Sequence, residues 1–199
     1  MTTIPAPLSS PQDFARAIPA RVKYLTGKPR NYRFNAKAGS LNHEGTEIIT
    51  EPGATFALIP LAARIFRASL FKTQERDWLE LFFLNQAGHL CTLAFHSSSV
   101  DRFKDALAAR AYYDEIDITQ ALITVKPMPR KHKQHGPYYV AEFQIEALPA
   151  AAAAKVHEMR EVLAPIYRAD TITPPESIIL QDGYSIPRLP AAESYSDAA

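Results

Sequence analysis

The sequence predicts a mainly β protein with added helices, organised around a small barrel of five strands. Three observations lead to this fold class. Five strand-like runs lie between residues 54 and 145, a helix-patterned segment interrupts them after the third run, and an amphipathic helix follows the fifth. The expected order is therefore strand, hairpin, helix and hairpin, with an N-terminal extension before it.

The first two runs are apolar on both sides. Run 54–71 contains Pro60, which cannot donate a ladder hydrogen bond and so predicts a bend, a bulge or an edge position. Run 77–85 alternates, and a strand places its side chains on two faces. One face then carries Leu79, Leu81 and Phe83, and the other carries Trp78, Glu80, Phe82 and Leu84.

Turn residues and helix signals separate the remaining runs. Asn-Gln-Ala-Gly at 85–88 precedes the alternating run 89–95, which predicts a hairpin. Three serines at 97–99 are candidate helix caps, and the apolar spacing after them predicts a helix over 100–113. The last two runs, 121–125 and 138–145, are joined by the segment 126–137, which is expected to be a polar loop.

In this order the strands resemble the OB-fold, a five-stranded Greek-key barrel whose loops and one strand face bind oligonucleotides or oligosaccharides. The resemblance covers about the middle half of the chain and rests on strand order, without a family-specific motif. It implies a single-stranded DNA-binding protein that works through sequence-tolerant stacking and phosphate contacts. Many bacterial single-strand binders end in an acidic tail, and Glu193 and Asp197 form only a weak acidic run at the corresponding place.

Composition divides the chain into four parts. Residues 1–50 are expected to be a basic extension that packs on the barrel, 51–148 the barrel, 149–170 a C-terminal helix, and 171–199 an extended, partly disordered tail. The helix carries an apolar stripe, formed by Val156, Met159, Leu163, Ile166 and Tyr167. This stripe packs on the barrel or, as the alternative, forms a homodimer contact.

Charge is distributed unevenly along the chain. The 22 Lys and Arg nearly balance the 21 Asp and Glu, for a net charge of +1. The first 39 residues hold seven cations and one acid, whereas residues from 140 onward hold nine acids and four cations. This asymmetry is compatible with a basic binding surface and an acidic end that repels the same ligand, and equally with two ordinary solvated surfaces.

Cysteine usage and hydropathy favour a cytoplasmic protein. The single Cys91 cannot form an internal disulfide, and the N-terminus shows no apolar leader. We interpret Cys91 as a small buried hydrophobic residue. No apolar run approaches the ~20 residues that span a bilayer, so no membrane partner is expected.

Candidate binding residues are cations that neutralise phosphates and rings that stack on bases. The segment 126–137 is the strongest signal, because it holds four cations and no acid. The segment 27–37 interleaves cations with rings. Trp78 and Phe82 lie about 13 Å apart on the outward strand face, at ~3.3 Å per residue. The full set is Arg30, Tyr32, Arg33, Arg64, Arg67, Trp78, Phe82, Lys126, Arg130, Lys131, Lys133 and Tyr138.

Several of these residues have a structural alternative. Tyr32 and Phe34 would point inward on an ordinary edge strand, and core packing is the favoured interpretation of Phe82, whereas Trp78 is expected to be exposed. One of Arg64 and Arg67 is expected to pair with an acid and the other to reach a phosphate. His132 and His135 have metal-ligand spacing but no third ligand nearby, so neither a metal nor a cofactor is expected.

The leading hypothesis is a non-catalytic protein that binds single-stranded DNA through a basic, ring-bearing barrel groove with little sequence specificity. It would act in replication, recombination or repair, for instance of a phage or mobile element. The alternative is a structural or regulatory protein–protein adaptor, and a metal-dependent nuclease comes third because the acids around the predicted helix lack a His or Ser at interpretable spacing. The sequence leaves open DNA against RNA, site size, oligomeric state and pathway.

Overall fold

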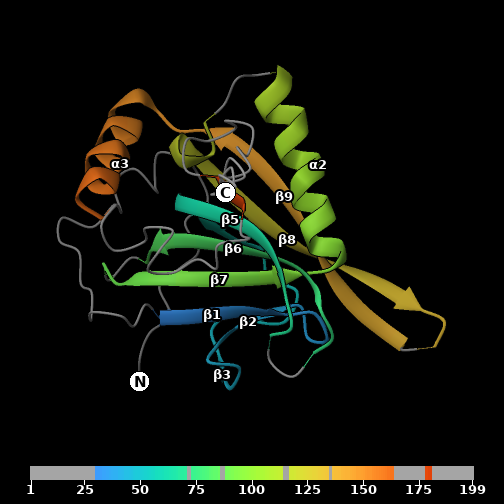
Figure 1. Cartoon of the computed structure of the whole chain (residues 1–199). Helices are drawn as coiled ribbons and strands as arrows, with labels where there is room; N and C mark the ends of the chain where they lie inside the picture. Colours follow the sequence, from blue (N-terminus) through green and yellow to red (C-terminus); the bar gives the residue numbers. More distant parts are fainter. Residues whose placement is uncertain are drawn as a thin grey trace, which may run out of the picture.

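The computed structural model describes residues 30–70, 73–85, 88–113, 117–134, 136–163 and 178–180. Strands dominate, and they form two open sheets flanked by the helices α2 (Ser98–Tyr113) and α3 (Ala150–Leu163) (Figure 1). The mainly β fold class is therefore confirmed. None of the helices in these ranges is long and apolar enough to cross a membrane.

The larger sheet has seven strands in the order β10-β5-β6-β7-β1-β2-β3. β5, β6 and β7 are consecutive antiparallel neighbours, and β1 runs parallel to β7. The hairpin predicted over 77–95 is present as β6 and β7. The strand bounds are β1 Arg30–Asn35, β2 Ser40–His43, β3 Glu47–Ile48, β5 Pro60–Ala68, β6 Arg76–Leu84, β7 Leu90–His96 and β10 Ile178–Leu180.

The smaller sheet consists of β4 (Phe56–Leu58), β8 (Ala121–His132) and β9 (Gly136–Ala147) in that order. The prediction of a polar loop over 126–137 is wrong, because most of this segment continues the β8–β9 hairpin. Pro127 and Pro129 made a loop the natural interpretation. Residues two apart on a strand present their nitrogens to the same edge, so these prolines leave the other edge of β8 able to pair with β9.

A corner in the chain and a backbone hydrogen bond join the two sheets. β4 ends at Leu58 and β5 begins at Pro60, so a single run of sequence passes from one sheet to the other at Ile59. The register of β5 against β6 shifts just after Pro60, which is the irregularity that this proline predicted. On the far side, the Tyr139 amide of β9 donates to the Ala36 carbonyl that follows β1, at 2.6 Å.

A closed five-stranded barrel is not confirmed. Closure would require β7 to pair with the last strand of the second hairpin. Both edges of β7 are already occupied, one by β6 and the other by β1. The part of the N-terminal extension that the structure describes therefore forms strands of the larger sheet and takes the place where the barrel would close.

The main core lies between the two sheets and against α2. Leu79, Leu81 and Phe83 project into it from β6, as the alternation predicted, and Phe103 enters it from α2. Its fully buried members include Leu79, Leu81, Leu93, Phe95, Val100, Phe103, Ile118, Ile123, Val125 and Ile145. This shared core ties the strands of both sheets together.

Helix α3 packs on a second apolar cluster, which includes the other face of β6. Ala152 and Val156 of α3 belong to this cluster together with Leu61 and Phe82, and Met159 packs against it. Of the predicted stripe, Val156 is thus buried and Met159 half-buried within this chain. The side chains of Leu163, Ile166 and Tyr167 lie outside the described residues, and the homodimer contact stays a prediction.

Candidate nucleic-acid interface

The turn end of the β8–β9 hairpin extends beyond the rest of the two sheets (Figure 1). We call the part of this hairpin between Lys126 and Tyr139 the basic arm. Lys126, Arg130, Lys131 and Lys133 are all exposed on it, and its sequence contains no acid. The strongest sequence signal therefore lies on a projecting two-stranded ribbon instead of a loop.

Strand register distributes these cations over both faces of the basic arm. Residues directly opposite one another in an antiparallel pair share a face. Arg130 lies opposite Tyr138, so a guanidinium and a half-buried ring share one face, whereas Lys131 lies opposite Pro137 on the other. A chain of phosphates lying along either face would meet a cation.

Most of the charge on the basic arm is not offset by acids. Within the described part of the chain, no carboxylate lies within 4.0 Å of the ammonium groups of Lys126, Lys131 or Lys133, while Arg130 Nη2 lies 3.3 Å from Glu142 Oε1. On the body of the molecule, other cations do have carboxylate partners, namely Arg64, Arg67, Arg102 and Lys104. The basic arm is therefore a concentration of positive charge, which among the described residues is offset only by Glu142, the partner of Arg130 and the residue opposite Lys126 in register.

The base of the basic arm rests on the turn between β1 and β2. The Tyr139 ring lies against Gly39, where an added Cβ would approach the ring carbons to 2.7 Å, and Gly39 has φ +66. Only glycine suits both the left-handed backbone and this close approach. Lys37, exposed on the same turn, is a cation near the arm that was not among the expected site residues, although the cation-rich segment 27–37 includes it.

Trp78 does not lie on an exposed surface, so its predicted exposure is wrong. The side chain is only 3% exposed, the indole Nε1 donates to the Ala68 carbonyl at 3.0 Å, and the ring meets His96 edge-on at 5.2 Å. Phe82 is equally buried, in the cluster beneath α3, which confirms the core interpretation that the sequence favoured for it. Neither ring can stack on a base in this structure.

Arg64 is also buried, and it forms an ion pair with Glu80 on the neighbouring strand. Its guanidinium lies 4.5 Å from the centre of the Phe66 ring. Burial raises the pKa of Glu80, and the charge and hydrogen bond of Arg64 oppose that rise. The prediction that one of the two β5 arginines pairs with an acid is confirmed here, and Arg64 is not available to a phosphate.

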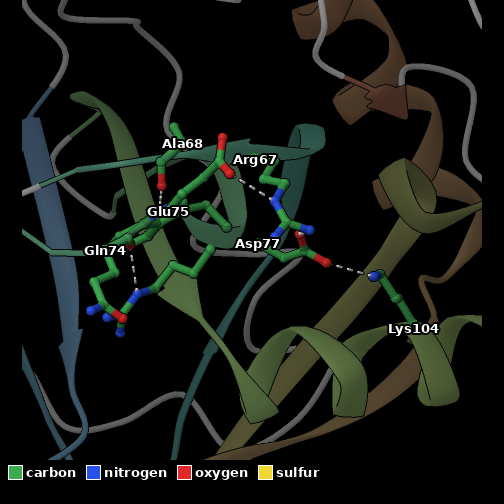
Figure 2. A network of polar contacts seen from close by, with 8 residues as sticks. Arg67, Ala68, Gln74, Glu75, Asp77 and Lys104 are labelled. Atoms are coloured by element: carbon green, nitrogen blue, oxygen red, sulfur yellow. Dashed lines mark hydrogen bonds and ion pairs between the residues drawn. The ribbon is translucent and has the colours of Figure 1, made fainter.

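Arg67 belongs to a surface network that links the β5–β6 hairpin to α2 (Figure 2). Its Nε lies 3.3 Å from Glu75 Oε2 and its Nη1 4.0 Å from Asp77 Oδ1, while Asp77 Oδ2 lies 3.4 Å from Lys104 Nζ. Two acids thus offset two cations. This network carries less net charge than the basic arm and is a weaker candidate for phosphate contact.

The candidate binding residues on β1 differ in how deeply they are buried. Tyr32 packs between His43 and Phe83, with ring centroids 5.6 and 6.0 Å away, and burial raises the pKa of its phenol. The inward-facing alternative is thus confirmed for Tyr32. Arg33 is half-buried, and burial lowers its pKa against the opposing influence of Glu44. Arg30 starts the strand about 20 Å from Ala36, at ~3.3 Å per residue, and so lies far from the basic arm.

The structure therefore places five of the expected residues on one hairpin, namely Lys126, Arg130, Lys131, Lys133 and Tyr138, whereas the other candidates lie on strands of the larger sheet. His132 is exposed on the same arm, and His135 lies outside the described residues. Among the residues with described positions, no three His, Cys, Asp or Glu side chains gather into a metal-binding group. Comparison with known proteins finds no matching family, no similar curated protein and no similar solved structure.

Proposed function

We propose that this protein binds single-stranded DNA through the basic arm and does not catalyse a reaction. One observation carries the proposal: four exposed cations are concentrated on a projecting hairpin, and three of them have no carboxylate partner in the described part of the chain. Cations in this arrangement neutralise backbone phosphates and release condensed counterions, which drives binding.

A ring beside the cations supports a single strand as the ligand. Tyr138 shares a face with Arg130, and an unpaired base can stack on an aromatic side chain at ~1 to 3 kcal/mol per base. Phosphate contacts carry no sequence information, so binding with little sequence specificity follows from this composition. Such an activity fits a role in replication, recombination or repair.

The order of elements also supports the proposal. A three-stranded antiparallel unit, a helix and a second hairpin follow one another in the chain as β5, β6, β7, α2, β8 and β9. In the OB-fold the second hairpin flanks the binding face. The proposal needs this order of elements but not a closed barrel, because the cations lie on the projecting part of the β8–β9 hairpin and not inside a barrel groove.

The protein–protein adaptor is less well supported. It relied on the outward face of β6 and the apolar stripe of α3 as binding surfaces. Phe82 from β6 and Val156 from α3 are buried in the same cluster within this chain, so these two residues are occupied. The adaptor hypothesis would need another surface.

The test compares the wild type with Lys131→Ala/Lys133→Ala, using fluorescence anisotropy of labelled oligo-dT at several salt concentrations. We expect the double variant to bind roughly tenfold more weakly, at ~0.7 kcal/mol for each lost exposed contact. The slope of log K against log salt should decrease by about 1.4, because each phosphate contact on a single strand contributes ~0.7.

Arg67→Ala is the matched control, since it removes an exposed cation that already pairs with acids. It should change affinity little. Wild-type protein that binds no oligonucleotide at low salt, or a double variant that binds like the wild type, would overturn the proposal. Parallel titrations with duplex DNA and single-stranded RNA establish which nucleic acid is preferred.

A further inference from the structure

Two arginines from different elements converge on one carboxylate oxygen beside the basic arm. Arg130 Nη2 on β8 and Arg102 Nε on α2 lie 3.3 and 3.4 Å from Glu142 Oε1 on β9. All three side chains are partly exposed, at 46% for each arginine and 36% for the glutamate. Asp105 lies at the margin of this cluster, 3.8 Å from Arg102 Nη1. Of these two arginines only Arg130 was expected from the sequence, because only the tertiary structure brings α2 against β9.

The fold holds the two arginines together without help from Glu142. The Ala141 amide on β9 donates to Ser99 Oγ in the first turn of α2 at 3.0 Å, and this hydrogen bond is buried. Phe103 of α2 also packs edge-on against Phe143 of β9, at 5.3 Å between ring centroids. Ion pairs as exposed as those of Glu142 contribute little to stability. The position of Arg102 near Arg130 is therefore set mainly by packing.

A carboxylate between two guanidinium groups occupies the place that suits a phosphate. Guanidinium groups donate to carboxylate and phosphate oxygens in the same geometry, and they bind both strongly. Glu142 is also the first acid after the acid-free sequence of the basic arm. A phosphodiester that reached Arg102 and Arg130 would have to displace this side chain.

We infer that Arg102 and Arg130 form a phosphate-binding pair, and that Glu142 occupies the pair in the free protein and competes with the nucleic-acid backbone. The inference rests on the proposed function and adds to it Arg102 as a binding residue and Glu142 as an internal competitor. Glu142 thereby lowers the affinity for single strands, and its removal exposes two cations at once.

The test is Glu142→Gln, which keeps the shape of the side chain and removes its charge. We expect this variant to bind labelled oligo-dT roughly tenfold more tightly than the wild type at the same salt. The slope of log K against log salt should increase by about 0.7 to 1.4, for one or two additional phosphate contacts. Arg102→Ala should weaken the binding of oligo-dT on its own, because it removes one member of the pair, and it should abolish the gain when combined with Glu142→Gln.

Glu146→Gln is the matched control. Glu146 lies on the same face of β9, and its carboxylate accepts from Gln144 Nε2 at 2.7 Å, so this variant changes the net charge equally without touching the arginine pair. Tighter binding by Glu142→Gln than by Glu146→Gln supports the inference. Equal affinities, or a gain that survives Arg102→Ala, overturn it while the proposed function stands. A wild type and a Glu142→Gln variant that both fail to bind overturn the two together.

Discussion

Trp78 is the only tryptophan of the chain, and the hydrogen bond from its indole to the Ala68 carbonyl explains how it can lie buried near a charged surface. Asp77 precedes it and points to the other face of the strand, where it joins the network with Arg67 and Lys104. An exposed neighbour in sequence therefore says nothing about the exposure of the residue beside it, because alternate residues of a strand face opposite sides.

Trp78 provides a direct optical test of this arrangement. Because the indole is buried, titration with oligo-dT should change its fluorescence intensity and emission maximum only slightly. Trp78→Phe should leave the affinity for oligo-dT unchanged and lower the free energy of unfolding by about 1 kcal/mol, through loss of the indole hydrogen bond. Urea denaturation measures the second quantity. Strong quenching on addition of nucleic acid would show that bases stack on Trp78 after all.

The buried pair of Glu80 and Arg64 should give the stability a characteristic pH dependence. Burial raises the pKa of Glu80 in the folded protein, so the folded state holds this proton at pH values where the unfolded state has lost it. The free energy of unfolding should therefore fall as pH rises from about 4, the usual carboxyl range, through the raised folded pKa.

Removing Arg64 should extend the pH range over which the free energy of unfolding falls. Arg64→Met eliminates the charge and the hydrogen bond that oppose the rise, so the folded pKa of Glu80 increases further and stability continues to fall at higher pH. At neutral pH the variant should lose about 3 to 5 kcal/mol, because a buried carboxylate is left without its cation. Urea denaturation at several pH values measures both effects, and Arg67→Met, on the exposed network, is the control that should show neither.

At the scale of elements, the β8–β9 hairpin differs most from its predicted form. Prolines and cations made 126–137 resemble a loop, yet β8 continues through Pro127 and Pro129 to His132. In the described strands β4 pairs with β8 only at Ile123–Val125, so the two prolines lie where the outer edge of β8 has no partner. Proline is tolerated at such an edge, and it prevents further strands from adding there.

Because the β8–β9 hairpin contacts the β1–β2 turn, two glycine substitutions should lower the free energy of unfolding by different amounts. Gly39→Ala should lower the free energy of unfolding by roughly 1 to 3 kcal/mol more than Gly53→Ala. Both residues have positive φ, at +66 and +77, but only at Gly39 would the added Cβ meet the Tyr139 ring, whereas nothing lies within 4 Å at Gly53. Thermal or urea denaturation measures the difference. Equal losses would mean that the Tyr139 ring moves aside at no cost.

At the scale of the whole molecule, the two sheets share one core and one continuous run of chain. Leu81 and Leu93 of the larger sheet and Ile123 and Ile145 of the smaller one are buried in the same cluster. β4 and β5 pass from sheet to sheet at Ile59. Neither sheet can lose its partner without exposing this core, so the sheets are expected to unfold together.

Native-state hydrogen exchange can test this cooperativity. Core amides of both sheets, such as those of Leu81, Leu93 and Ile123, should exchange only through global unfolding and should report the same opening free energy. Amides of the basic arm, such as that of Lys131, should exchange through cheaper local opening because the arm extends beyond the core. Two distinct free energies for the two sheets would instead indicate separate folding units.

Local pattern was sufficient for the elements whose signal lies within a few residues. The alternation of 77–85 and 89–95 predicted β6 and β7, and the spacing after the serines predicted the helix that the structure shows as α2. Pro60 correctly predicted the irregularity at the start of β5, where its register against β6 shifts. The basic arm was found as a cluster of cations, although its backbone conformation was not. Lys37, Arg102 and Glu142 were missed, because their place beside the arm depends on contacts between distant segments.

The sequence by itself determined that the protein is mainly β, which residues share a strand face, and where the cations cluster. A side chain's direction follows from the period of its element, and a run of charged residues is visible in the sequence without knowledge of the fold. Only the tertiary structure decided that β1 occupies the free edge of β7, that α3 covers Phe82, and that Arg102 joins Arg130. A periodic pattern states which residues share a face, but what covers that face depends on segments far away in the chain.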